Sequence, residues 1–139
     1  MSELKDICVS LETAKTLLYS PINIITEFYW YKPNYSKELN IKCEWNICDH
    51  KNMLGWSYAE IENCQYEFYP APTNEELERY ITKDYSNYNI KLNSHYNEGK
   101  TMIEFFNLYH ANQLYLKSKW HEKKSDALAE ILIKLERRS

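Results

Sequence analysis

The sequence predicts an α+β domain in which three helices cover one face of an antiparallel sheet of about five or six strands. Two observations carry this prediction. Strand-like segments follow one another through short turns, and three other segments place apolar residues at helical spacing. The predicted order is one helix, three strands, a helix, two or three strands and a final helix. The chain of 139 residues has no linker or internal repeat, so residues 1–139 are expected to form a single domain.

The first helix is expected to begin after Ser10, whose hydroxyl can accept a hydrogen bond from a backbone amide of the first turn. Aromatic and β-branched residues predict a strand from Ile24 to Tyr31. Strict alternation predicts a half-buried strand from Leu39 to Ile47, and "CQYEFYP" is again strand-like. The segment from Met53 to Cys64 fits either a short helix or an irregular strand. The apolar residues of the first helix share one face: Leu11, Ala14, Leu17 and Leu18.

The stretch "YPAPTNEELERY" predicts a corner where a strand gives way to a helix. Thr73 and Glu76 have the spacing of a capping box, in which each side chain accepts a hydrogen bond from the backbone amide of the other residue. Pro72 and Leu77 occupy the positions of a hydrophobic staple. This corner is interpreted as structural rather than as a binding site.

A hairpin is expected around the turn Asn97-Glu98-Gly99-Lys100, where Gly99 supplies a positive φ. Its first strand turns Ile90, Leu92 and Tyr96 inward, and its partner, Met102 to Tyr109, is apolar on both faces. A further strand within "NQLYLKSKWHE" places Leu114, Leu116 and Trp120 on one side.

The last helix is expected to be capped by Ser125. Ile133 falls off its apolar stripe. The outer faces of the strands around Tyr29, Tyr31 and Phe105 also look too apolar for water, so a symmetric dimer that involves this helix is expected. The stripe that docks the helix on its own sheet has five members: Ala127, Leu128, Ile131, Leu132 and Leu135.

Composition limits the classes of function. The net charge of −3 and the pI near 5.8 lack the basic footprint of nucleic-acid binding, so a nucleic-acid partner is disfavoured. Only two glycines are present, and the glycine-rich phosphate-binding patterns are absent. No apolar run reaches the length of a membrane span, and the first residues do not form a secretory signal. The expected location is therefore the cytoplasm, with reduced cysteines.

No metal site, cofactor or catalytic residue is predicted. Alternation places Cys43 on the apolar face of its strand and Cys48 on the other face, which does not let two thiolates converge on zinc. Cys43 is therefore expected to resist thiol reagents more than Cys48. His95 and His110 lie on the two sides of the hairpin turn and are interpreted as a solvated cross-strand pair. The residues of this region that are of a zinc-ligating type are Cys43, Cys48, His50 and Cys64.

Two groups of aromatic and basic residues are candidates for a binding surface. One group lies on the first predicted strand, and the other places aromatic and basic side chains on one face of "YLKSKWHE". A solvated edge strand protected by lysines explains the second group equally well. The candidate binding residues are Tyr29, Tyr31, Tyr115, Lys117, Lys119 and His121.

Three spaced segments, "SLETAKTLL", "YPAPTNEELERYI" and "SDALAEILIKL", resemble small uncharacterised proteins of phages, prophages and mobile elements of gut Bacteroidetes. The chain lacks the tryptophan expected near Tyr80, and its segment 85–121 is longer and more polar. The resemblance implies a shared fold and brings no catalytic residues. The matching residues are Ser10, Leu11, Glu12, Ala14, Lys15, Leu18, Ala71, Pro72, Thr73, Leu77, Ala127, Leu128 and Leu132.

Together these features predict a cytoplasmic accessory protein of phage or mobile-element type that binds a protein partner without catalysis. Two alternatives stay open. The chain could instead be a small enzyme, or a counter-defence protein that sequesters a ligand or nucleotide, with a pocket lined by aromatic residues. It could also be a minor structural component of a virion.

Overall fold

The computed structural model describes residues 4–20, 22, 24–32, 45–49, 67–84, 90–107 and 114–137. Within these residues the fold is α+β, as predicted, with four helices and six strands. The helices are α1 (Leu4–Ile7), α2 (Leu11–Leu18), α5 (Asn74–Asp84) and α6 (Lys124–Arg137). The strands are β1 (Phe28–Lys32), β2 (Asn46–Asp49), β3 (Glu67–Pro70), β4 (Ile90–Asn97), β5 (Lys100–Asn107) and β6 (Leu114–Lys117).

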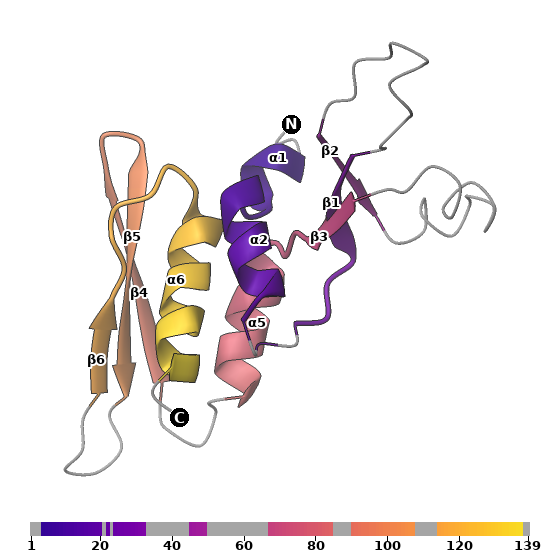
Figure 1. The fold of residues 1–139 in the computed structure, drawn as a ribbon. Coiled ribbons are helices and arrows are strands. Elements are labelled where there is room, and N and C mark those ends of the chain that lie inside the picture. Colours follow the sequence, from indigo (N-terminus) through magenta and orange to yellow (C-terminus); the bar gives the residue numbers. More distant parts are fainter. Residues whose placement is uncertain are drawn as a thin grey trace, which may run out of the picture.

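The strands pair antiparallel, as predicted, but they form two sheets instead of one. The first sheet has the order β2-β1-β3 and the second the order β4-β5-β6. The helices lie between the two sheets, which prevents the strands on one side from pairing with those on the other (Figure 1). Short turns predict which neighbouring strands pair. The layer of helices that separates β3 from β4 depends on contacts between residues distant in sequence.

Helix α6 lies at the centre of the molecule, with the β4-β5-β6 sheet on one side and α2 and α5 on the other (Figure 1). Its predicted stripe is buried, from Ala127 to Leu135. Ala129 is also fully buried, because the helix is covered on more than one side. Ile133 is half-buried and packs against the same core, so it does not supply the exposed apolar surface expected for a dimer.

The predicted corner before α5 is confirmed. The Thr73 N–H donates to Glu76 Oε1 at 2.9 Å, and the Glu76 N–H donates to Thr73 Oγ1 at 3.2 Å. Pro72 and Leu77, the predicted staple residues, are fully buried. The same Glu76 carboxylate reaches the segment before β1, where Thr26 Oγ1 donates to it at 2.8 Å and the Glu27 N–H at 2.9 Å.

The first and last helices differ from prediction at their ends. Ser10 caps α2, accepting from the Thr13 N–H at 3.3 Å, but Leu18 is 48% exposed instead of sharing the buried face. Ser125 does not cap α6, because the helix already begins at Lys124 and Ser125 lies buried in its first turn. The short helix α1 was not predicted.

The boundaries of the first sheet also differ from prediction. Strand β1 begins at Phe28 instead of Ile24, because the residues before it are tied to α5 through Glu76. Only residues 45–47 of the predicted strand from Leu39 to Ile47 are described. The ambiguous segment from Met53 to Cys64 lies outside the described residues.

The hairpin turn is confirmed, with φ of 51° at Glu98 and 77° at Gly99. Strands β4 and β5 pair along their whole length without interruption. Two expectations for this sheet are wrong. Tyr96 is 69% exposed, because the tip of the hairpin extends beyond the N-terminal end of α6 (Figure 1). Phe105 is 1% exposed and belongs to the core, so it adds no apolar surface to the outside of the sheet.

Candidate binding surface

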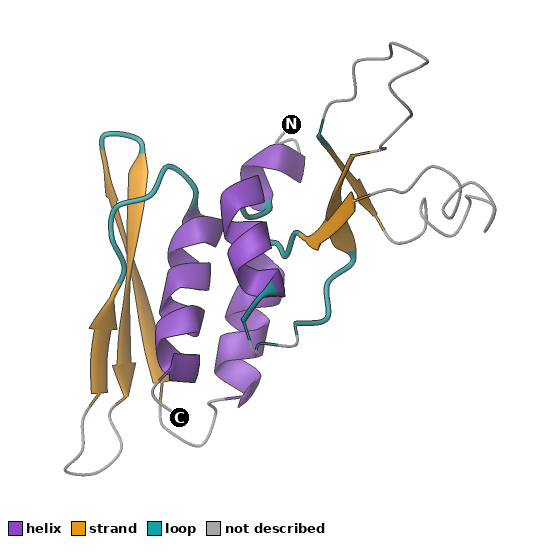
Figure 2. Cartoon of the chain, viewed as in Figure 1, coloured by secondary structure: helices purple, strands orange, loops and turns teal. Residues whose placement is uncertain are grey.

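The β4-β5-β6 sheet has a face that no described helix covers. All described helices lie on its other side (Figure 2). Because side chains alternate along a strand, the buried residues Phe105 and Leu116 define the side toward α6. The residues that alternate with them point away from α6, and we call this side the outer face. It consists of Lys91, Asn93, His95, Asn97, Lys100, Met102, Glu104, Phe106, Tyr115 and Lys117.

Glu104 lies at the centre of the outer face and joins the three strands. The Tyr115 hydroxyl on β6 donates to Glu104 Oε2 at 2.5 Å, and His95 Nε2 on β4 is hydrogen-bonded to Glu104 Oε1. These bonds lower the pKa of Glu104, with Tyr115 as the largest cause, and the bond to Glu104 raises the pKa of Tyr115. At neutral pH the face therefore presents an ionised carboxylate and a protonated phenol in a fixed arrangement.

An aromatic pair lies next to this network. The rings of Phe106 and Tyr115 have centroids 5.0 Å apart and planes tilted by 46°, a favourable geometry for aromatic side chains. Phe106 is half-buried and Tyr115 is 47% exposed. Tyr115 is thus held by Glu104 at its hydroxyl and by Phe106 at its ring, which restricts its motion before any partner binds.

The outer face is locally basic. Lys91, Lys100 and Lys117 lie on it, and Glu104 is its single carboxylate among the described residues, so with neutral histidine its net charge is 3 − 1 = +2. The whole chain carries −3. This contrast gives the outer face an electrostatic preference for acidic partners.

The structure does not bring the six predicted binding residues together. Tyr115 and Lys117 lie on the outer face, as the alternation predicted. Tyr29 and Tyr31 are half-buried on β1, which belongs to the other sheet beyond the helices (Figure 1). They form no common surface with Tyr115.

His121 leaves the predicted face because an extra residue interrupts the pairing. Between the pairs Glu104–Lys117 and Thr101–His121, the chain advances three residues on β5 but four on the segment after β6. This bulge reverses the alternation and turns His121 toward α6, where its Nε2 lies 2.8 Å from Glu130 Oε1. His121 is therefore not part of the outer face.

The same bulge places Lys119 against α6. Its backbone N–H donates to both carboxylate oxygens of Glu130, at 3.2 and 3.1 Å, while its side chain is exposed. Burial raises the pKa of Glu130, but hydrogen bonds from His121 and Lys134 and from the Lys119 backbone outweigh burial, and the net effect lowers the pKa. The hydrogen bonds of Glu130 with Lys119 and His121 connect α6 to the segment that follows β6.

Sequence reasoning missed Lys91, Glu104 and Phe106 as surface residues. The strand from Met102 onward was interpreted as apolar on both faces, which hid the alternation of Glu104 with buried neighbours. His95 was paired with His110, but it bonds to Glu104 instead, and His110 lies outside the described residues. The register implied by the confirmed turn was the signal that could have found this network.

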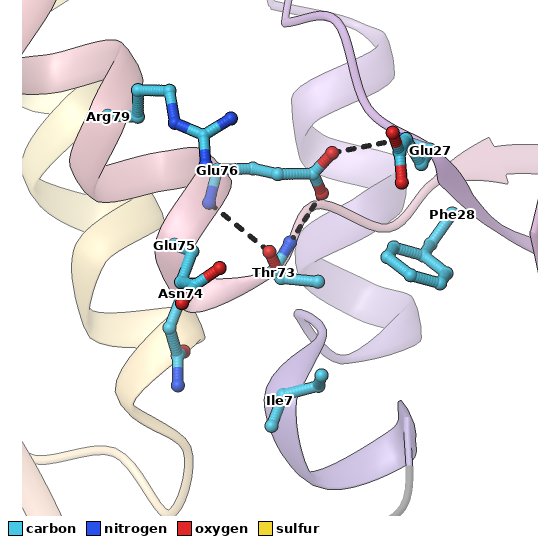
Figure 3. A pocket seen from close by; sticks show the side chains of 8 residues that line it. All are labelled: Ile7, Glu27, Phe28, Thr73, Asn74, Glu75, Glu76 and Arg79. Atoms are coloured by element: carbon cyan, nitrogen blue, oxygen red, sulfur yellow. Dashed lines mark hydrogen bonds between the residues drawn. The ribbon is translucent and has the colours of Figure 1, made fainter.

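A cavity of about 610 Å³ lies at the start of α5 (Figure 3). Phe28 is its aromatic wall, and Glu76 faces it, although the Glu76 carboxylate is already occupied by structural hydrogen bonds. Asn74 Oδ1 is buried there without a hydrogen-bond partner in the described part of the chain. The ligand-binding alternative requires a pocket lined by several aromatic residues. Among the described residues that line this cavity, Phe28 is the one aromatic side chain. Its full lining is Ile7, Glu27, Phe28, Thr73, Asn74, Glu75, Glu76 and Arg79.

The described cysteines, Cys8 and Cys48, are free thiols and both are buried. Burial raises the pKa of Cys8 to about 12 and that of Cys48 to about 11. The expected exposure of Cys48 is therefore wrong, because Cys48 is 6% exposed. The described residues contain no group of histidine, cysteine and acidic side chains that could hold a metal. Cys43, His50 and Cys64 lie outside the described residues.

Comparison with known proteins gave no match to a family model, to a curated protein or to a solved structure. No helix in the described ranges is long and apolar enough to cross a membrane.

Proposed function

We propose that this protein acts by binding a protein partner, without catalysis, through the outer face of the β4-β5-β6 sheet. The observation that carries the proposal is the fixed cluster on an uncovered sheet: Phe106, Tyr115 and Glu104 are held together, with lysines around them. Tyrosine is among the residues that contribute most to binding energy at protein interfaces. Because Tyr115 is already immobilised, little side-chain entropy is lost on association.

The charges favour an acidic protein over a nucleic acid. A partner with carboxylates can pair with Lys91 and Lys117 at the borders of the face and can donate a hydrogen bond to Glu104 at its centre. A phosphate backbone offers only acceptor oxygens and would be repelled by the ionised Glu104, whereas an acidic protein can place N–H donors at Glu104 and its carboxylates at the lysines. The net charge of −3 also supports this choice, because it lacks the basic excess typical of nucleic-acid binding.

The proposal gives the Glu104 cluster a binding role and no catalytic step. A general acid or base is most effective when its pKa lies near the working pH. The pKa of Glu104 is lowered and that of Tyr115 is raised, so both move away from neutrality. The cluster is better suited to hold one arrangement of donors and acceptors than to exchange protons.

The biological setting of the proposal comes from the sequence resemblance to phage and mobile-element proteins of gut Bacteroidetes. In that setting the protein would work in the cytoplasm of the bacterial host and occupy a host or phage protein.

A comparative capture experiment tests the proposal. The tagged chain is used to capture proteins from a gut Bacteroidetes lysate, in parallel with the outer-face variant Tyr115→Ala/Lys117→Glu. The matched control is Tyr19→Ala/Lys83→Glu, which makes the same chemical change at two exposed positions, the residue that follows α2 and a residue of α5. We expect one or more proteins to be enriched by the wild type and the control and lost with the outer-face variant.

Nuclease treatment of the lysate distinguishes the alternatives. Enrichment that survives nuclease and depends on Tyr115 and Lys117 supports the proposal. Enrichment that disappears with nuclease, or binding of a 20-nucleotide single-stranded DNA that the outer-face variant abolishes, would replace it with nucleic-acid binding. Equal capture by all three chains would show that the outer face is not the binding surface.

A further inference from the structure

We propose that two copies of this chain pair through the free edge of β4, forming a symmetric dimer with one continuous six-stranded sheet. Strand β4 lies at the edge of its sheet, and among the described residues its only partner strand is β5. It spans Ile90–Asn97 without a proline or a break in register, and Lys91 is its single charged residue. Proteins usually protect such edges with bulges, prolines or several charges, because an open edge pairs readily with another strand.

The side chains of β4 carry a second sign of an absent neighbour. Tyr96 is 69% exposed although it lies on the side of the sheet that faces α6, opposite the buried Thr101. Leu92 lies on the same side and is half-buried, opposite Phe105. A large exposed aromatic residue and a half-covered leucine therefore lie four residues apart on one side of an open strand.

The register of a β4 pair follows from the alternation of side chains. Residues opposite one another in antiparallel strands must point to the same face. Asn97 and Lys100 flank a two-residue turn and form a hydrogen-bonded pair, so the backbone N–H and C=O groups of Asn97 point toward β5. Because this direction alternates along a strand, the backbone groups of Tyr96, Ser94 and Leu92 point toward the free edge. A two-fold axis at Ser94 pairs these residues and places Leu92 opposite Tyr96 of the partner subunit.

This register is self-complementary in shape and charge. Each Leu92 is covered by Tyr96 of the partner subunit. The two-fold symmetry repeats this contact, so the exposed tyrosine rings of both subunits are buried. On the outer face, Asn93 lies opposite His95 of the partner subunit and can hydrogen-bond with it. Lys91 lies opposite Asn97 of the partner subunit, so no like charges meet. Moving the axis to Asn93 would instead place Lys91 against His95 of the partner subunit, which is less favourable.

Dimerisation goes beyond the proposed function because it also sets the valency of the binding surface. In this arrangement the two outer faces lie on the same side of the continuous sheet. A partner with two acidic sites could then bind both faces at once, which increases avidity without new contacts. The dimer itself does not depend on the identity of that partner.

Light scattering coupled to gel filtration tests the dimer. At about 50 µM we expect the wild type at twice the chain mass of 16.8 kDa. Tyr96→Lys, which places a charge opposite the leucine of the second copy, should elute at the monomer mass with an unchanged circular dichroism spectrum. Tyr19→Lys changes another exposed tyrosine, the residue that follows α2, which is 81% exposed, and this variant should stay dimeric. A monomeric wild type, or a dimer that Tyr96→Lys leaves intact, would overturn the proposal.

A cysteine variant tests the register. The Cα atoms of a hydrogen-bonded antiparallel pair lie about 5.5 Å apart, within the range that a disulfide can span. Ser94→Cys should therefore form a covalent dimer under mild oxidation, seen on a non-reducing gel. Tyr96→Cys lies opposite a leucine in this register and should not, and the wild type controls for the native cysteines. Absence of the Ser94→Cys dimer, or equal cross-linking of the two variants, would rule out the two-fold axis at Ser94.

Discussion

Replacing Glu76 with alanine should destabilise the fold more than alanine at either of the nearby polar residues Thr73 and Glu75. Its carboxylate accepts three hydrogen bonds, from the Thr73 N–H, from Thr26 Oγ1 and from the Glu27 N–H, at 2.9, 2.8 and 2.9 Å. A typical hydrogen bond contributes about 1 kcal/mol to stability. Their loss in Glu76→Ala should therefore lower the free energy of unfolding by about 3 kcal/mol.

Two comparisons make this magnitude testable. Thr73→Ala removes the reciprocal half of the capping box and should cost about 1 kcal/mol. Glu75→Ala removes a neighbouring exposed acid that stabilises α5 only through its interaction with the helix dipole, and it should lower the free energy of unfolding by about 0.5 kcal/mol. Urea unfolding followed by circular dichroism measures all three, with the slope m expected to be unchanged. For a chain of this size, about 3 kcal/mol corresponds to a fall of roughly 10 °C in Tm. If Glu76→Ala cost no more than Glu75→Ala, the link from α5 to the segment before β1 would contribute nothing to stability.

Three further predictions concern other contacts. Trp30→Phe removes the bond from Trp30 Nε1 to the Val9 carbonyl, 2.8 Å long and buried, and should cost about 1–3 kcal/mol in the same assay; no change would show that the carbonyl finds another donor. The pKa of Glu130 is lowered below the 4.5 of the unfolded chain, so its contribution is present above pH 4.5 and is lost as pH falls further. Glu130→Gln should reduce stability at pH 7 and flatten its decline in acid; an identical pH profile would contradict this. Cys8 and Cys48 should stay unmodified by iodoacetamide at pH 8 until the chain is unfolded, as read by peptide mass mapping; rapid native labelling of Cys48 would contradict its burial.

Local chemistry made much of the fold predictable. The caps at Ser10 and Thr73 and the turn at Gly99 depend on residues a few positions apart, and all three were confirmed. The buried stripe of α6 was also predictable from its spacing. Ser125 was chosen as a cap by its residue type alone. The helix begins at Lys124, two residues before the start at Asp126 that a cap at Ser125 implies.

The division of strands into two sheets was not predictable in this way. The turn residues show that β4 and β5 pair, but nothing local shows that the helices separate β3 from β4. For the same reason Tyr29 and Tyr115 could not be assigned to different sides of the molecule. Strand periodicity identifies two faces and does not say which face a helix will cover.

The composition of the outer face was predicted in part. Alternation placed Tyr115 and Lys117 together, and they share the outer face. The same alternation failed at His121, because one extra residue in the pairing turns every later side chain to the opposite face. Glu104 was missed because its role depends on two neighbouring strands, which a single segment does not reveal.

Site-specific photo-crosslinking in living cells tests most directly whether the outer face binds a protein. Benzoylphenylalanine would replace Tyr115 on the outer face or, as the control, Tyr19 at the end of α2, where the ring is 81% exposed. Both changes keep an aromatic side chain at an exposed position. After illumination of a bacterial host that expresses the chain, we predict a discrete protein adduct from the Tyr115 position and none from Tyr19. No protein adduct at Tyr115, the same adducts at both positions, or an adduct that nuclease removes would contradict the account.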